Sequence, residues 1–244
     1  MKTKNLTQKL NFFELVGIII GDESIWNYPD KGVYGLEITG NADDDNEYFL
    51  KISNFIEKII NKKPRIAVKY ERLGKSLKLV VYSKDFVKYL IDEVGITNID
   101  KTFNVAIPEK YMEWKYSQHV LRGIFETDGC LYFSKSGGII HYPRIEIKTS
   151  SIELAKQITF ILKQNNFKPY TRTSKSDKTT AIYLSGPIML EKWHSEIGFG
   201  NAKNLSKYLF WKKFGYYMPR ISLKKRLDML ELSARVAKRP IIDA

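Results

Sequence analysis

The sequence predicts an α+β protein built from two pseudo-symmetric halves, each with the element order α-β-β-α-β-β-α. Two observations support this fold class. A short block of sequence occurs twice, starting at Leu15 and at Leu121, and each copy is followed by the same succession of strand and helix patterns. A repeat at a constant offset of 106 residues indicates a duplicated structural unit. The 244 residues suffice for one large domain or two small ones in close contact.

The repeated block reads LVGIIIGDE in one copy and LRGIFETDG in the other, with Leu, Gly, Ile and Asp in common. Small residues lie four apart in both copies, at Gly17 and Gly21 and at Gly123 and Thr127. Residues four apart share one face of a helix, and small ones allow another backbone to approach closely. The two blocks are therefore predicted to be helices that pack against each other.

The elements after each block follow in matching order. The segments 35–39 and 144–148 alternate apolar and polar residues, as half-buried strands do. Next come helical patterns at 48–60 and 152–165, then two hairpins, 64–70 with 77–82 and 169–173 with 180–184, and finally helices at 84–93 and 187–196. Each last helix precedes a glycine, Gly95 or Gly198, that can serve as a left-handed cap.

These patterns divide the chain into a first half (1–96), a linker (97–118), a second half (119–215) and a basic C-terminal extension (216–244). The linker contains Pro108 and no long periodicity. From Arg220 to Arg239, seven Lys or Arg residues face only two acidic ones, and leucines form a partial helical stripe. A solvated helix docked on the body is favoured over a dedicated DNA clamp.

Charge and composition indicate the class of partner. Lys and Arg number 40 against 27 Asp and Glu, and the resulting charge of +13 attracts polyanions, so nucleic acid is the leading partner. Solubility alone is the competing explanation for such a charge. The longest apolar stretches, such as 15–20, are too short for a membrane span, and a secretory signal is not expected at the N-terminus. The single cysteine, Cys130, cannot form an internal disulfide, which predicts an intracellular setting, cytoplasmic in a prokaryote or within an organelle.

Asp22 and Asp128 each follow the last small residue of their block, so packing of the two helices brings two carboxylates together. Like charges side by side cost free energy unless a proton or a cation neutralises them, and hard oxygen ligands suit Mg²⁺. The alternative is that each aspartate caps a turn at a helix end. The occurrence of the same aspartate in both copies favours a metal site on the pseudo-twofold axis.

Both blocks resemble the LAGLIDADG motif, and the similarity covers most of residues 12–215, including the segments 101–108 and 200–204. The first copy departs from the motif at Glu23, where glycine is expected. The chain is thus similar to the single-chain, two-motif homing endonucleases. That resemblance implies an Mg²⁺-dependent endonuclease that binds a long pseudo-palindromic double-stranded DNA site in the major groove and cuts both strands, leaving short 3′ overhangs. It also implies that Asp22 and Asp128, with the carbonyl groups of Gly21 and Thr127, bind the metal, and Mn²⁺ or Ca²⁺ can occupy the same sites.

The resemblance further implies that each half curves a four-stranded antiparallel sheet into the major groove. The strand alternation agrees, because the apolar residues Leu36, Ile38, Ile145 and Ile147 would face the core and leave polar neighbours outside. Arg and Lys can reach guanine, and Glu can accept from cytosine, although an ordinary solvated sheet face would show the same alternation. The candidate DNA-contacting residues are Glu37, Thr39, Arg65, Lys69, Lys78, Tyr132, Arg144, Glu146, Lys148, Tyr170, Arg172 and Tyr183.

Members of this family usually place a basic residue near each scissile phosphate. Lys84, after the fourth strand of the first half, is the best match, although a solvated lysine at a helix start would look the same. Its counterpart falls near Gly186, which suggests two unequal sites. Asn41 and Thr149, at the ends of the second strands, are further candidates for a polar role.

Two other functions fit parts of the pattern. A non-cleaving DNA-binding regulator or an RNA-intron maturase of the same fold would keep the basic surface, but the intact aspartate pair argues against it. A basic RNA-binding protein of structural or ribosome-associated type would need no paired acids. Nucleotide hydrolysis is not expected without a glycine-rich phosphate loop, and His119, His141 and His194 lack metal-ligand spacing. Because the duplication already supplies both halves, we expect a monomer with no obligate protein partner.

Overall fold

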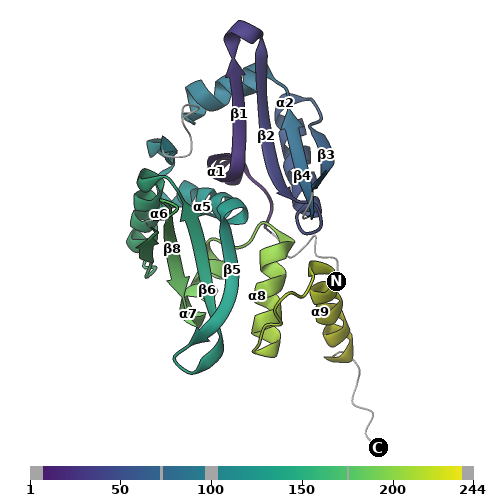
Figure 1. Cartoon of the computed structure of the whole chain (residues 1–244), viewed down its shortest axis with the longest axis vertical. Coiled ribbons are helices and arrows are strands. Elements are labelled where there is room, and N and C mark those ends of the chain that lie inside the picture. The colour runs from purple at the N-terminus through teal and green to yellow at the C-terminus, as the bar shows by residue number, and fades with distance from the viewer. Residues whose placement is uncertain (1–7, 72–73, 97–103, 175, 238–244) are drawn as a thin grey trace, which may run out of the picture.

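The computed structural model describes residues 8–71, 74–96, 104–174 and 176–237, without the side chains of residues 22, 23, 71 and 232–237. These residues form two four-stranded antiparallel sheets and the helices that flank them (Figure 1). The predicted α+β class and the order α-β-β-α-β-β-α in each half are confirmed.

The first half begins with the helix of the first repeated block, and its sheet has the strand order β1-β2-β4-β3. Its last helix continues as a π-helix, η3, where the sequence predicted one uniform helix over 84–93. The elements are α1 (Phe12–Asp22), β1 (Glu23–Tyr28), η2 (Pro29–Lys31), β2 (Val33–Asn41), α2 (Asn46–Ile60), β3 (Arg65–Glu71), β4 (Gly74–Val81), α3 (Lys84–Lys88) and η3 (Tyr89–Val94).

The second half repeats this arrangement with the strand order β5-β6-β8-β7, and two further helices, α8 and α9, follow its last repeated helix, α7. The elements are η4 (Glu109–Tyr111), α5 (Trp114–Asp128), β5 (Gly129–Ser136), β6 (Ile139–Thr149), α6 (Ile152–Gln164), β7 (Tyr170–Thr173), β8 (Thr180–Ser185), α7 (Pro187–Glu196), α8 (Ala202–Phe214) and α9 (Leu223–Ala237).

Helix α5 begins at Trp114, so its first turn lies inside the range 97–118 that the sequence assigned to the linker. Residues 97–103 of that range lie outside the described part of the chain. Pro108 precedes the short helix η4, so this segment is less irregular than its composition suggested. The two glycine caps are confirmed, since Gly95 has φ 84° and Gly198 has φ 78°, in the left-handed region that glycine adopts at little cost.

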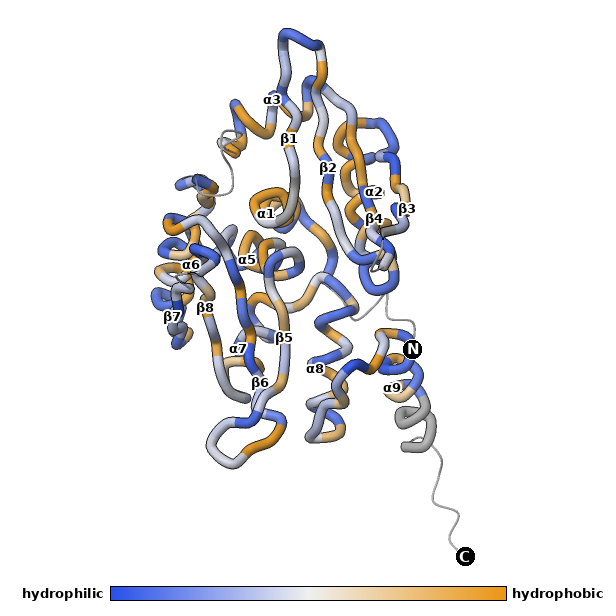
Figure 2. Tube along the Cα trace, viewed as in Figure 1, coloured by the Kyte–Doolittle hydropathy of each residue, from blue (hydrophilic) through white to orange (hydrophobic). Residues whose placement is uncertain are grey.

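Helices α2 and α3 cover one face of the first sheet, and α6 and α7 cover one face of the second. Helices α1 and α5 lie side by side between the two sheets (Figure 1). Figure 2 shows α1 as a largely apolar segment, in agreement with Leu15, Val16, Ile18 and Ile19, which are fully buried. A helix that is apolar on every side must be surrounded by protein, so the core runs through α1 from one half into the other.

Each half is also tied to the other by the segment that follows its last helix. In the segment after the first half, the Val105 carbonyl accepts a hydrogen bond from Ser151 Oγ of the second half at 2.6 Å. The backbone N–H and carbonyl of Ile107 form two hydrogen bonds with the Gln157 side chain. After the second half, Asn201 Nδ2 donates to Asp45 Oδ1 at 2.7 Å. The crossing segments therefore bind the corner between the second strand and the second helix of the opposite half.

None of the described helices combines the length and the apolar character needed to cross a bilayer.

Candidate active site and nucleic-acid interface

Helices α1 and α5 pack closely enough for their backbones to touch. A Cβ atom built on Gly17 would lie 2.0 Å from the Val120 carbonyl oxygen, and one on Gly123 would lie 2.1 Å from the Glu14 carbonyl oxygen. One turn further on, a Cβ on Gly21 would lie 1.9 Å from Thr127 Oγ1. The predicted faces of small residues thus form the contact. Later residues of α1 contact later residues of α5, so the two helices run parallel and their C-terminal ends lie next to each other.

A buried ion pair reinforces this contact between the start of α1 and the middle of α5. Arg122 of α5 places Nη2 2.8 Å from Glu14 Oε2 of α1, and both side chains are almost fully buried. Tyr48 OH donates to Glu14 Oε1 at 2.8 Å, and Arg122 Nη1 donates to the Ile197 carbonyl at 2.9 Å. Burial raises the pKa of Glu14, and Arg122 opposes that rise. The pair therefore holds the two halves in one relative orientation through directional hydrogen bonds, which a purely apolar contact lacks.

The adjacent helix ends provide a negative site. Asp128 Oδ2 lies 3.3 Å from the position of a Cβ on Gly21, so this carboxylate adjoins the last turn of α1. The C-terminus of a helix carries partial negative charge and carbonyl groups without helical partners, and two such ends meet here. Carboxylate and carbonyl oxygens are the donors that a hard divalent cation prefers, so Asp128 and the neighbouring backbone fit a metal.

The metal-ligand roles of Asp22, Asp128, Gly21 and Thr127 remain predictions. The side chain of Asp22 lies outside the described part of the structure, as does that of Glu23. Among the side chains that are described, no three or more His, Cys, Asp and Glu residues gather in a way that could hold a metal ion.

A cavity of about 250 Å³ opens beside Thr127 at the end of α5. Its wall includes the last residues of β2, among them Gly40 and Asn41, together with Asp45 and Glu126. Lys203 of α8 also lines it, and among these lining residues it alone carries a positive charge. Lys203 Nζ lies 2.9 Å from Asp45 Oδ1. The cavity therefore lies between the end of α5 and Lys203, whose position is fixed by the Asp45 carboxylate.

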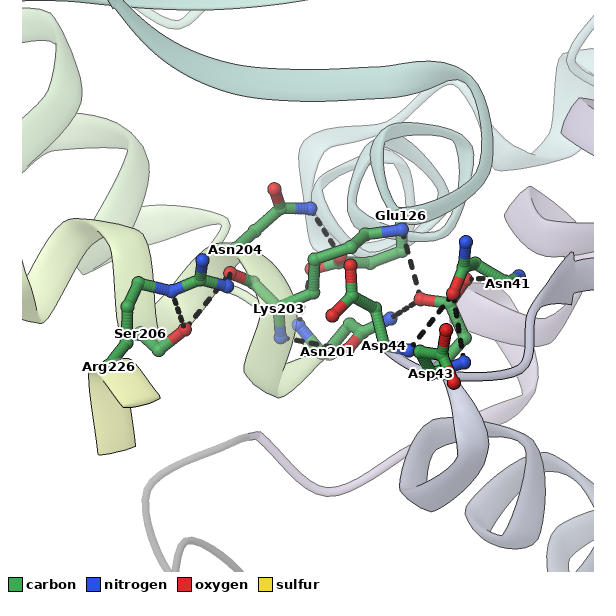
Figure 3. Close-up of polar contacts among 11 residues, drawn as sticks. Asn41, Asp43, Asp44, Glu126, Asn201, Lys203, Asn204, Ser206 and Arg226 are labelled. Atoms are coloured by element: carbon green, nitrogen blue, oxygen red, sulfur yellow. Dashed lines mark hydrogen bonds and ion pairs between the residues drawn. The ribbon is translucent and has the colours of Figure 1, made fainter. Parts of the chain in front are cut away.

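Glu126 fixes the segment that carries this lysine (Figure 3). Its Oε1 accepts from the Gly200 backbone N–H and its Oε2 from Asn204 Nδ2, both at 2.8 Å. Burial raises the pKa of Glu126 to about 7, while the hydrogen bond from Asn204 lowers it. The residue is thus a structural anchor that links α5 to the start of α8.

The structure places Lys84, the sequence candidate for a basic catalytic residue, away from the ends of the motif helices. This lysine is the first residue of α3, is exposed, and places Nζ 5.5 Å from the centre of the Tyr34 ring. Glu23, which follows the first motif, pairs with Ile38, whereas Tyr34 pairs with Asn27 near the far end of the same ladder. Tyr34 and Ile38 are about 13 Å apart along the strand. Lys84 therefore lies near the end of β2 that is remote from the ends of the motif helices, and its catalytic role stays a prediction.

Lys203 is the basic residue that sequence reasoning missed, although the sequence carries a signal for it. Lys101 and Lys203 follow the capping glycines Gly95 and Gly198 by six and five residues. A search for a basic residue shortly after each capping glycine would therefore have found both lysines, although the unequal spacing does not align them in the repeat. Lys101 lies outside the described residues, so only Lys203 is placed.

The two weaker candidates at strand ends take part in local turns. Asn41 Oδ1 accepts from the backbone N–H groups of Asp43 and Asp44 at 2.9 and 3.2 Å. Thr149 Oγ1 accepts from the Ser151 backbone N–H at 3.1 Å. These contacts account for both polar side chains without a catalytic role, although Asn41 does line the cavity.

In the first half, the outward candidates share one face of the sheet. Register pairs Thr39 with Lys78 and Lys78 with Ala67, and it places Glu37 and Arg65 opposite Val80. Directly opposed residues of antiparallel strands project from the same face. Lys69 joins this face opposite Ser76, and Glu37 and Lys78 form an ion pair on it.

In the second half, the candidates again lie on a single face. Register aligns Tyr132 with Arg144, and Glu146 with Tyr183, which in turn pairs with Tyr170. Lys148 and Arg172 both lie opposite Ala181. Arg144 Nη1 donates to Tyr170 OH at 2.8 Å, and the Tyr170 and Tyr183 rings stack 4.9 Å apart. Ile145 and Ile147 face the core, as the alternation predicted. Contact of either face with DNA remains a prediction.

The basic extension contains a helix docked on the body, as favoured from the sequence. Arg226 of α9 is buried, and its Nε donates to Ser206 Oγ of α8 at 3.0 Å. Its Nη1 donates to Tyr217 OH and to the Ile221 carbonyl at 3.2 and 2.6 Å. Helix α9 thus packs against α8, which itself lies beside β5 (Figure 1). Residues 238–244 of the extension lie outside the described part.

Two parallel motif helices between two curved antiparallel sheets define the two-motif LAGLIDADG architecture. A family model described as a LAGLIDADG-like domain matches residues 116–209. Residues 116–209 thus match a LAGLIDADG-like domain, and the chain has the fold of the single-chain LAGLIDADG homing endonucleases, which confirms the resemblance found in the sequence.

Solved structures of such enzymes share the fold over most of the chain. A point mutant of the meganuclease I-SmaMI is 12% identical with a TM-score of 0.58, covering 98% of this chain and 100% of its own. The homing endonuclease I-WcaI, bound to its DNA recognition sequence, is 16% identical with a TM-score of 0.54, covering 80% and 84%. Mesophilic variants of I-DmoI are 15% identical with a TM-score of 0.54, covering 76% and 93%. No curated protein sequence matches the chain.

Proposed function

We propose that this protein is a site-specific homing endonuclease. It binds a long pseudo-palindromic double-stranded DNA site in the major groove and hydrolyses both strands with divalent metal, leaving short 3′ overhangs. The observation that carries this proposal is the parallel contact of α1 and α5, which brings the ends of both motif copies together between two sheets. Adjacent ends of the two motif helices would allow one chain to place a cleavage centre at each of the two DNA strands.

Divalent metal is the proposed cofactor. Asp22 and Asp128, with the carbonyl groups of Gly21 and Thr127, would hold Mg²⁺, and Mn²⁺ or Ca²⁺ would occupy the same positions. Complexes of I-DmoI with DNA have been solved with Mn and with Ca, which supports divalent metal use in a protein of the same fold. When bound, the metal supplies an activated water and stabilises charge on the phosphate and on the departing oxygen.

The chain's own residues would position the DNA and balance its charge. The polar faces of the two sheets carry Arg and Lys side chains that can contact bases and phosphates. Lys203, in the cavity beside Thr127, replaces Lys84 as the proposed basic residue near a scissile phosphate. Its ammonium group would stabilise the negative charge that grows on the phosphate during hydrolysis.

Selection for cleavage from a randomised duplex library with Mg²⁺ tests the proposal and finds the target together. We expect a long selected site cut in both strands, with no cutting in EDTA. The Asp128→Asn variant serves as the protein control, because it keeps the shape of the side chain and removes its charge. Recovery of no cleaved duplex in Mg²⁺ or Mn²⁺ would reject the proposal.

A further inference from the structure

Asp45 occupies the N-cap of α2, yet its side chain does not cap that helix. Aspartate at an N-cap normally accepts a hydrogen bond from the first turn of its own helix. The corresponding residue of the second half, Ser151, does so by accepting from the Leu154 backbone N–H at 3.1 Å. The carboxylate of Asp45 is therefore committed to other contacts, and these differ between the two halves.

Two of the three side-chain partners of Asp45, Asn41 and Lys203, line the cavity beside the motif helix. Its Oδ1 accepts from Asn201 Nδ2 at 2.7 Å and lies 2.9 Å from Lys203 Nζ, while its Oδ2 accepts from the Asn41 backbone N–H at 2.8 Å. Asp45 is only 5% exposed. Three donors from two elements thus fix the carboxylate in one orientation, and the carboxylate in turn fixes the lysine.

This contact joins opposite halves of the protein. Asp45 belongs to the first half, whereas Asn201 and Lys203 belong to the second half, just after α7 (Figure 3 shows Asn201 and Lys203 beside the Asn41 turn). Asn201 Oδ1 also accepts from the Lys203 backbone N–H at 2.9 Å, so a single bridge sets both the backbone and the side chain of the lysine. At the matching corner of the second half, Ser151 donates instead to the neutral Val105 carbonyl.

We propose that Asp45 is a positioning residue that holds Lys203 at one of the two cleavage centres, so that one DNA strand depends on this carboxylate and the other does not. The inference rests on the proposed endonuclease function. An isolated lysine on a flexible stem loses conformational entropy when it is fixed at a phosphate, and Asp45 supplies that order before DNA binds. A salt bridge that only stabilised the fold would affect both strands alike.

Strand-resolved cleavage of the selected duplex, labelled on either strand, tests the proposal with the full-length protein. The Asp45→Asn variant should slow cutting of one strand at least about tenfold, as expected when a charged group near the reacting phosphate is misplaced. The other strand should be cut at the wild-type rate, and a nicked duplex should accumulate. Lys203→Met should slow the same strand, and it leaves Asp45 with two of its three donors, which protects the fold.

Ser151→Ala is the matched control, because the partners of this side chain in the described part of the chain are the backbone groups of Leu154 and Val105. It should lower the free energy of unfolding and leave the ratio of the two strand rates unchanged. Equal slowing of both strands in Asp45→Asn and Lys203→Met, or no slowing in either, would overturn the positioning role while the endonuclease function stands. A wild-type protein that cuts neither strand would overturn both.

Discussion

Four small residues determine how closely the two central helices approach. At Gly17, Gly21 and Gly123 the neighbouring atom stands where a Cβ would be, and Thr127 fills the space beside Gly21. Residues of this size in matched positions were visible in the sequence, as was the aspartate after each. The contact could therefore be predicted from spacing alone, since helix geometry places residues four apart on one face.

Replacing Gly123 with alanine should destabilise the protein strongly. The new Cβ would lie 2.1 Å from the Glu14 carbonyl oxygen, which belongs to a helix backbone and cannot move aside. We expect a loss of about 2–4 kcal/mol in the free energy of unfolding, measured by urea denaturation.

Gly32→Ala is the control for this prediction. Gly32 has φ 62° and open space around its Cβ position, so alanine there should cost only about 1 kcal/mol of backbone strain. Similar losses in both variants would show that α1 and α5 do not touch as described.

The positions of Lys84 and Lys203 relative to the motif helices could not be predicted from the sequence. The pairing of β2 with β1 and β4 determines which end of β2 lies near the motif helices. The position of Lys84 follows from that pairing. Lys203 reaches the site through a segment that crosses between the halves. A pattern of short period carries no information about such long-range placement.

At the scale of elements, most helices and all strands except β1 and β5 could be located from the sequence, because their periods are local. The helix α7 begins and ends where expected, at Pro187 and Glu196, and the outward faces of both sheets hold the residues assigned to them. The π-helical turns of η3 were not predicted, because an α-helix and a π-helix bury much the same stripe of residues over so short a stretch. The early start of α5 was missed because Trp114–Gln118 lacks an apolar stripe.

The ion pair between α1 and α5 leads to a prediction at this scale. Arg122→Leu should destabilise the protein by about 3–5 kcal/mol, because it leaves the buried Glu14 carboxylate without its partner. The double variant Glu14→Leu with Arg122→Leu should recover much of that loss, since no buried charge remains. Urea denaturation of both variants measures the difference. A double variant less stable than Arg122→Leu alone would argue against a coupled pair.

At the scale of the whole molecule, one chain supplies two motif helices and two sheets. Each half contributes one motif helix and one sheet, and the crossing segments after η3 and α7 bind each half to the other. The exposed sheet faces differ in sequence, with Glu37 and Thr39 in one half where the other has Glu146 and Lys148.

We therefore expect a single chain to bind an asymmetric DNA site. Light scattering of the protein–DNA complex should give one chain per duplex, and the half-sites of the selected target should differ, because different side chains read them. Two chains on a perfect palindrome would contradict this expectation even if cleavage were observed.

The central claim is that the aspartates at the ends of α1 and α5 form the cleavage centre, and cleavage by their asparagine variants tests it most directly. On the selected duplex with Mg²⁺, Asp22→Asn and Asp128→Asn should each abolish double-strand cleavage, because each removes a carboxylate that would hold the metal. Binding to the same duplex in Ca²⁺ should persist, since the sheet faces are unchanged. Mg²⁺-dependent cutting of both strands by both variants, at the wild-type rate, would contradict the account.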